Sequence, residues 1–382
     1  MKTLAWLFGI FFCASSAYGQ KTVTIEGDIR NMPDTVVIGC AEKKGNSINI
    51  RPEDYEKMVN GKFKFTREVD KTTLMYISLN NTGYTVWVKP GANIKITGEA
   101  PYVQNWQAVS DIPIPEQTEL SRFREATREE NIQIHDLTAE CMKLIPKIRA
   151  KDSIAKFRFD SLRLAVNNIH DRIILQKELE IMVDHPVTDA GLAELRDAAK
   201  SCKAGKLKDK ALVVSVYSKL TDEQKQSQLG KEITSLLSIT STVQEGDKIA
   251  DAELKDIEGN IHHLSDYKGK YIILDFWSRN CGFCQNALPE LREIAEKYKG
   301  KVVIIGLSVD LEEVWREELK KSTDNWPQLS DGLGMSGIAA HYGIHALPTF
   351  IYISPESTIL KIQIGYRQNS LSDNILTFTK DK

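Results

Sequence analysis

The sequence predicts a multidomain protein with an all-β N-terminal module, a helical middle region and a C-terminal α/β domain. Apolar and polar residues alternate across residues 21–99, which is the period of strands. Across residues 113–238 apolar residues recur at steps of three and four, which is the period of helices. From residue 243 onwards, strand-like and helix-like segments alternate. A length of 382 residues suits two or three such domains.

The first 19 residues have the pattern of a cleavable secretory signal peptide. Lys2 supplies the positive charge, and residues 4–14 form an apolar run too short to cross a membrane. Ala17 and Gly19 are the small residues that precede a cleavage site. We therefore expect a soluble periplasmic protein, in an oxidising space.

Two alternatives to cleavage remain, an N-terminal anchor and a lipid attached to Cys13. The residues before Cys13 are Ile10-Phe-Phe, which are bulky for a lipoprotein signal, so a lipoprotein anchor is disfavoured. The formal net charge of the chain is -2, and this balance does not point to nucleic acid as a partner.

The β-rich domain is expected over residues 20–112 as a small sandwich or barrel. Asn60-Gly61 and Pro90-Gly91 mark turns between its strands. The domain has no cluster of histidine, cysteine or acidic residues at catalytic spacing. We interpret it as a binding or scaffold module.

The helical region is expected over residues 113–242. One apolar face is predicted by four residues at steps of four, three and four, namely Leu162, Val166, Ile169 and Ile173. Pro186 is expected to end that helix, and Thr221 with Gln224 fits a capping box that begins a later one. Arg124 and the charged residues after it are expected to form a solvated face.

The α/β domain is expected over residues 243–382. A hairpin is predicted over 256–264, and further strands over 271–277, 302–309, 349–354 and 359–364. Helices should follow residue 281, begin near 312 and 370, and cover 338–342. This order predicts a mixed sheet with helices on both faces.

Cys281 and Cys284 form a Cys-x-x-Cys pair where the strand of residues 271–277 gives way to a helix. Unpaired backbone N–H groups and the positive end of the helix dipole stabilise a thiolate there. The pair therefore predicts thiol–disulfide exchange. Cys141 and Cys202 are expected to remain separate thiols.

The alternative use of such a pair is half of a zinc site, which requires two further ligands. His341 and His345 are four residues apart, but Pro348 follows too closely for a continuous helix. No metal and no cofactor is therefore expected.

Three further residues support redox chemistry. Asp275 is an acid in an otherwise apolar strand: at a sheet edge it would face water, whereas in a central strand its pKa should be raised by burial. It could then accept a proton from Cys284. Pro289 lies inside the following helix, and the Leu347–Pro348 bond could be cis.

Together these residues resemble the thioredoxin superfamily, and within it the secreted TlpA/ResA-like thiol–disulfide oxidoreductases. The matching segments are Leu274-Asp-Phe-Trp, the cysteine pair, Pro289-Glu-Leu, and residues 302–310 and 342–349. The resemblance covers residues 243–382 and implies a thioredoxin fold. The residues before it resemble, more loosely, the β-rich domain and helical linker that accompany such domains in many Gram-negative secreted proteins.

The resemblance implies a role for each matching residue. Cys281 would attack a substrate disulfide, Cys284 would resolve the mixed disulfide, and Asp275 matches the buried acid. Pro348 matches the cis-proline beside the cysteines, and the backbone of Leu347 would pair with the substrate chain. Trp277 matches the aromatic residue that packs beside the site.

The sequence departs from the family pattern at two positions. Asn280 replaces the usual Trp, which should leave Cys281 more open and provides a side chain able to cap the helix. Gly282-Phe283 replaces the usual Gly-Pro, so Phe283 either tunes the redox potential or contacts the substrate.

The leading hypothesis is a periplasmic reductase of protein disulfides, supplied with electrons by an upstream membrane donor. A disulfide isomerase or oxidase, and a non-enzymatic scaffold with a thioredoxin-like recognition module, are the alternatives. A peroxidase is disfavoured because Leu274 occupies the position of the proline in the peroxidase motif. The long helical region makes a homodimer plausible.

Overall fold

The computed structural model describes residues 21–33, 36–44, 47–79, 82–239 and 241–379. The expected signal peptide, residues 1–19, lies outside the described residues. The chain divides into two compact units, Met1–Gly191 and Leu192–Lys382. Within the described ranges, no helix combines the length and the apolarity needed to cross a bilayer.

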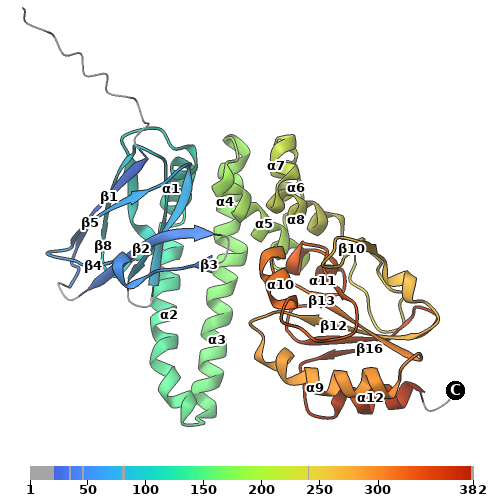
Figure 1. The fold of residues 1–382 in the computed structure, drawn as a ribbon. Helices are drawn as coiled ribbons and strands as arrows, with labels where there is room; N and C mark the ends of the chain where they lie inside the picture. The colour runs from blue at the N-terminus through green and yellow to red at the C-terminus, as the bar shows by residue number, and fades with distance from the viewer. Residues whose placement is uncertain (1–20, 34–35, 45–46, 80–81, 240, 380–382) are drawn as a thin grey trace, which may run out of the picture. The chain divides into compact units, whose positions relative to one another are not determined.

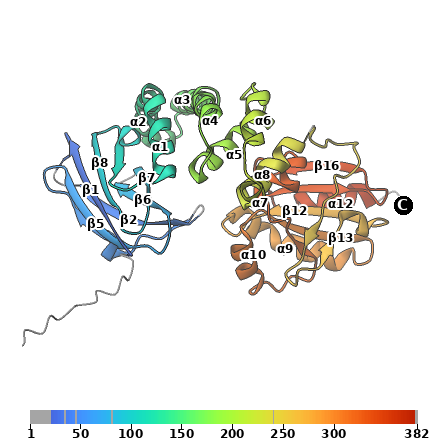
Figure 2. The same cartoon turned by 90° about the horizontal axis from the view of Figure 1, so that it is seen from above.

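The first unit begins with two sheets packed face to face (Figure 2). One sheet has the order β5-β1-β8-β9, from β1 (Thr22–Arg30), β5 (Lys62–Glu68), β8 (Asn93–Glu99) and β9 (Gln107–Ser110). The other has the order β3-β2-β6-β7, from β2 (Val37–Lys44), β3 (Ser47–Ile48), β6 (Thr73–Leu79) and β7 (Thr82–Val88), and β4 (Tyr55–Lys57) also pairs with β2. Inward-facing residues such as Ile25, Phe65 and Ile77 are fully buried between the sheets, so the expected sandwich is present.

Helix α1 (Pro115–Ala126) covers the edge of β7. The Gln117 side chain accepts a hydrogen bond from the Trp87 N–H at 2.9 Å, and the Arg124 guanidinium donates to the Thr85 carbonyl at 2.7 Å. These bonds satisfy backbone groups that an edge strand would otherwise leave unpaired. Arg124 is 6% exposed, so the expectation of a solvated side chain there was wrong.

A helical hairpin follows, made of α2 (Arg128–Arg149) and α3 (Ser153–Ile169) (Figure 1). A π-helical turn, His170–Ile174, joins α3 to α4 (Leu175–Asp184). The wider π turn shifts the phase of the helix, so Ile174 is buried and Ile173 is 42% exposed. The predicted apolar face therefore fails at Ile173. Helix α4 ends before Pro186, as predicted.

Helix α5 (Asp189–Lys203) spans the division between the units. The second unit continues with α6 (Lys210–Ser218), α7 (Asp222–Gln226) and α8 (Gln228–Ser238). The predicted capping box of Thr221 and Gln224 is present at the start of α7. Ser227 then caps α8, whose first turn donates the Gly230 N–H to the Ser227 hydroxyl at 3.1 Å.

The rest of the second unit contains a five-stranded mixed sheet in the order β14-β13-β12-β15-β16. Its strands are β12 (Tyr271–Trp277), β13 (Val302–Ser308), β14 (Gln328–Leu329), β15 (Thr349–Ile353) and β16 (Ile359–Ile364). Strand β12 is central, parallel to β13 and antiparallel to β15. The short hairpin of β10 (Leu254–Lys255) and β11 (Ile261–His262) precedes it, and its first strand lies just before the predicted range of 256–264.

Helices cover both faces of this sheet. Apolar residues of α9 (Gly282–Lys297) and α12 (Ser370–Thr379) pack on one face, and those of α11 (Ile338–His341) pack on the other (Figure 1). Helix α10 (Glu312–Leu319) follows β13. This arrangement is the thioredoxin-like fold that the sequence resemblance implied.

Glu290 fixes α9 against α12. Its buried carboxylate accepts backbone N–H groups at the start of α12, from Asn369 at 3.0 Å, Leu371 at 3.0 Å and Ser372 at 2.7 Å. A carboxylate is favourable at a helix N-terminus because it satisfies unpaired donors and interacts with the helix dipole. The Pro289-Glu-Leu segment thus holds together the two helices on one face of the sheet.

Candidate active site

Cys281 and Cys284 form a disulfide at the N-terminus of α9. Cys281 is half-buried and is itself the N-cap residue, since its Sγ accepts the Cys284 N–H at 3.1 Å. The expectation that Asn280 caps the helix was therefore wrong: Asn280 lies one residue before the cap and is exposed. Cys284 is 4% exposed, so only the first cysteine of the pair is open to a partner.

An apolar cluster surrounds the disulfide. Trp277 at the end of β12 and Trp315 of α10 are buried with Cys284, and Leu319 and Leu347 pack against them. The Trp277 indole N–H donates to the Gln328 Oε1 at 3.1 Å, which fixes its ring. Trp315 and Leu319 were missed in the sequence because no local pattern links α10 to the cysteines.

Asp275 occupies the middle of β12, where β13 and β15 flank it on both sides. It pairs in register with Gly306 on one side and Phe350 on the other, and it is 3% exposed. Burial, with a smaller contribution from the negative charge of Asp324, raises the pKa of Asp275 to about 7. Its Oδ1 has no hydrogen-bond partner among the described residues.

Asp275 and Cys284 line the same cavity, of about 140 Å³. Charged residues at its walls include Arg292, Glu318, Lys321 and Asp324. The Arg292 Nε lies 2.7 Å from the Asp324 Oδ1. A buried carboxyl group and a buried sulfur thus share a small polar space, which allows proton exchange between them.

The loop before β15 forms another wall of the site. The Leu347–Pro348 bond is cis, as the sequence suggested, and the Gly365 N–H donates to the Pro348 carbonyl at 2.8 Å. Pro348 is buried, and Leu347 is half-buried against the disulfide cluster. Phe283 lies next to Cys284 in the chain, but its side chain is 64% exposed.

The other candidate ligands do not gather into a metal site. No group of three histidine, cysteine or acidic side chains in the described part of the chain could hold a metal ion. His262 instead contacts the Asp256 carboxylate at 3.0 Å. Cys40, Cys141 and Cys202 are free thiols.

Comparison with known proteins assigns this site to a family. The model of the AhpC/TSA family matches residues 245–362. The thiol-disulfide oxidoreductase ResA of a Bacillus cereus strain is 31% identical over 124 residues, which are 32% of this chain and 71% of the relative. The chain belongs to the ResA family of thiol–disulfide oxidoreductases.

Other thioredoxin-like proteins are also similar to part of this chain. ResA of Bacillus thuringiensis subsp. konkukian is 33% identical over 28% of this chain, which spans only 61% of that relative's length. The thioredoxin-like protein YneN of Bacillus subtilis is 27% identical over 32% of this chain and 73% of its own. A crystal structure of the thioredoxin domain of a thiol-disulfide oxidoreductase from Bacteroides vulgatus is 26% identical, covering 36% of this chain and 99% of that one, with a TM-score of 0.33.

Proposed function

We propose that this ResA-family protein is a periplasmic reductase of protein disulfides that acts through Cys281 and Cys284. The observation that carries the proposal is the asymmetry of the pair. Cys281 is accessible at a helix N-terminus, whereas Cys284 is buried in the cavity that also holds Asp275. Residues 243–382 are proposed as the catalytic domain, with residues 20–112 and 113–242 as separate accessory regions.

In the first step the reduced protein attacks its substrate. The Cys281 thiolate forms a bond to one substrate sulfur, the substrate S–S bond breaks, and the second substrate sulfur leaves as a thiolate that takes a proton from water. The Cys284 N–H and the start of α9 stabilise the Cys281 thiolate before it attacks.

In the second step the mixed disulfide is resolved. Cys284 gives its proton to the Asp275 carboxylate through their shared cavity and attacks the Cys281 sulfur. The bond between Cys281 and the first substrate sulfur breaks, that sulfur leaves as a thiolate that takes a proton from water, and the Cys281–Cys284 disulfide seen in the structure is formed. Two electrons have passed from the protein to the substrate. A pKa of about 7 suits Asp275 to both accepting and releasing the proton near neutral pH.

The substrate chain is proposed to bind over the disulfide. The backbone of Leu347, held by the cis bond to Pro348, would pair with the substrate backbone, and Trp277 would support that loop through the buried cluster. The exposed ring of Phe283 would contact an apolar substrate side chain.

The charges near Cys281 favour reduction over oxidation. A strongly stabilised thiolate makes a dithiol an oxidant, because its reduced form is then favoured. Arg279 is the cation nearest in sequence, and its guanidinium is already paired with Glu317 at 3.2 Å and Glu318 at 3.5 Å. The buried Asp275 also opposes a negative charge on Cys284. We therefore expect the start of α9, and not the Arg279 cation, to stabilise the Cys281 thiolate, which favours a reducing pair.

The location of the protein, its electron donor and its oligomeric state are also part of the proposal. The signal peptide of residues 1–19 would place the protein in the periplasm, where an upstream membrane protein would return electrons to the disulfide. The helical region would allow a homodimer.

Reduction of insulin disulfides by the full-length mature protein, with dithiothreitol as the electron source, tests the activity. We expect faster reduction than with dithiothreitol alone, and we expect the Cys281→Ser change to abolish the gain. Cys202→Ser is the matched control, because Cys202 is a half-buried free thiol, and it should leave the rate unchanged. Equal rates with and without the protein would favour a scaffold role.

A further inference from the structure

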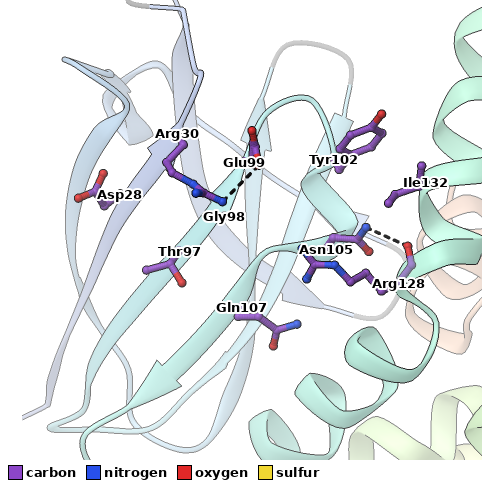
Figure 3. A pocket seen from close by; sticks show the side chains of 10 residues that line it. All are labelled: Asp28, Arg30, Thr97, Gly98, Glu99, Tyr102, Asn105, Gln107, Arg128 and Ile132. Atoms are coloured by element: carbon purple, nitrogen blue, oxygen red, sulfur yellow. Dashed lines mark hydrogen bonds and ion pairs between the residues drawn. The ribbon is translucent and has the colours of Figure 1, made fainter.

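Buried side-chain atoms without a hydrogen-bond partner occur in both units. In the first unit, the Asn105 Nδ2 donates to the Arg128 carbonyl at 3.0 Å beside a cavity of about 480 Å³ (Figure 3). The Asn105 Oδ1 is closed off by the protein, so a ligand in that cavity cannot reach it. In the second unit, the Asp275 Oδ1 is also buried and unpaired among the described residues. Here another side chain of the protein, Gln328, lines the same cavity as the carboxyl group.

The register of three strands brings Gln328 close to Asp275. Asp275 of β12 pairs with Gly306 of β13, and Gly306 pairs with Gln328 of β14, so the three residues lie in one row across the sheet. Side chains in such a row point to the same face. A Cβ atom built on Gly306 would lie 3.0 Å from the Gln328 Nε2 and closer still to its Oε1. The Gln328 amide therefore occupies the space that a side chain at Gly306 would fill, beside Asp275.

Trp277 determines how the Gln328 amide is oriented. The Trp277 indole N–H donates to the Gln328 Oε1 at 3.1 Å. An indole nitrogen can only donate, so the atom that faces it must be the amide oxygen. The amide nitrogen, with its two N–H donors, is thereby left for another acceptor in the cavity.

The cations near Asp275 are already paired with other carboxylates. Arg292 of α9 contacts Asp324 at 2.7 Å. Glu318 of α10 lies 3.5 Å from Arg279 and 4.0 Å from Lys321. On the β15 side the titratable neighbour is Tyr352, whose pKa is raised by burial, so it is neutral at pH 7. A negative charge on Asp275 therefore depends on neutral donors for its stabilisation.

We propose that Gln328 is a positioning residue for the resolving step, in which its Nε2 donates a hydrogen bond to the charged Asp275 carboxylate. The inference rests on the proposed function, because it concerns the base that takes the proton of Cys284. A neutral carboxyl group is a weak acceptor, whereas ionisation attracts the amide N–H and makes the hydrogen bond charge-assisted. Gln328 would keep Asp275 ionised and leave its other oxygen to accept the proton.

Titration of the Asp275 carboxyl carbon by NMR, in the oxidised full-length mature protein, tests the contact. Gln328→Met keeps the length of the side chain but cannot donate, so the pKa of Asp275 should rise by about 1. Gln285→Met is the matched control: Gln285 lines the same cavity but is exposed, and water screens its amide, so the pKa should not change. Loosening of the cluster alone would admit water and lower the pKa. An unchanged or lowered pKa in Gln328→Met overturns the proposal.

Stopped-flow reaction of the reduced protein with one equivalent of Ellman's reagent tests the consequence, in a Cys202→Ser background. The attack of Cys281 on the reagent disulfide releases one thionitrobenzoate, and the attack of Cys284 on the mixed disulfide releases the second. In Gln328→Met we expect the first release to be unchanged. The second should be about fivefold slower at pH 7, with its pH midpoint moved upwards.

The outcomes separate this inference from the proposed function. A second release with the same pH midpoint in the wild type and in Gln328→Met overturns the role of Gln328 and leaves the reductase intact. Absence of the second release in the wild type contradicts the proposed function, and the NMR titration then decides whether Gln328 contacts Asp275. Thermal unfolding of each variant shows that the second unit remains folded.

Discussion

The Arg292 Nε lies 2.7 Å from the Asp324 Oδ1, and the Asp324 side chain is only 5% exposed although Arg292 is half in solvent. The pair lines the cavity that contains Asp275 and Cys284. The negative charge of Asp324 helps to raise the pKa of Asp275. Burial remains the main cause of the raised pKa, and Asp324, which is not part of the disulfide, adds to it.

Substitutions of this ion pair should move the pKa of Asp275 in opposite directions. Asp324→Asn removes an anion and leaves the Arg292 cation unopposed, so the pKa should fall. Arg292→Gln leaves the Asp324 anion unopposed, so the pKa should rise. Titration of the Asp275 carboxyl carbon by NMR measures both. The exposed Glu313→Gln is the control and should have no effect, and shifts in the same direction for both variants would refute the coupling.

The raised pKa of Asp275 should make the folded protein less stable as pH rises. The folded state holds a proton that the unfolded chain has released between pH 3.8 and about 7, so stability is lost across that window. The loss should approach roughly 4 kcal/mol by pH 8. In Asp275→Asn this component of the pH dependence should disappear.

Guanidinium unfolding of the oxidised protein from pH 4.5 to pH 8 measures this dependence. Glu313→Gln again serves as the control, since it changes an exposed carboxyl on α10 and should keep the wild-type slope. A wild-type profile that is flat, or parallel to that of Asp275→Asn, would contradict the buried-acid account.

The exposures of the two cysteines predict which variant captures substrates. Cys284→Ser leaves an accessible Cys281 that attacks but cannot be resolved, so mixed disulfides with partner proteins should accumulate. Cys281→Ser leaves only the buried thiol and should capture little. Non-reducing electrophoresis and mass spectrometry of periplasmic extracts compare the two, with Cys202→Ser as the control. Equal capture by both single variants would show that the nucleophile is assigned to the wrong residue.

Trp315 should protect Cys284 from solvent. Trp315→Ala is expected to cost about 3–5 kcal/mol of stability and to open the cluster around the second cysteine. In a Cys281→Ser background, iodoacetamide should then alkylate Cys284 faster, while Trp315→Phe should keep it protected. Trp326 is similarly buried but belongs to a different cluster, so Trp326→Ala should lower stability without exposing Cys284. Alkylation rates from peptide mass spectrometry decide between these outcomes.

Much of the second unit could be predicted because its signals are local. The cysteine pair, the strand before it and the cis-proline segment each lie within a few residues of chain. The position of Asp275 could not be decided in this way, since only the pairing of β12 with β13 and β15 makes that strand central and its acid buried. Trp315 and Asp324 reach the site from loops and helices distant in sequence, which leaves no periodic pattern to find.

Local rules also failed where the backbone departs from a regular helix. The step pattern that ended at Ile173 assumed an uninterrupted α-helix, and the π turn at His170–Ile174 moved Ile174 inward instead. Asn280 has a side chain typical of helix caps, but Cys281 takes that position because its sulfur accepts the Cys284 N–H. In the first case a shift of one residue changed which side chain is buried. In the second it changed which side chain caps the helix.

The most direct test of the proposed reductase is the reduction potential of the Cys281–Cys284 pair in the full-length protein. Equilibration with dithiothreitol and glutathione buffers, followed by alkylation and mass analysis of the active-site peptide, gives this value. The account predicts a reducing pair, near the thioredoxin value of about −270 mV or lower. A value at or above about −180 mV, as in disulfide isomerases and oxidases, would contradict it.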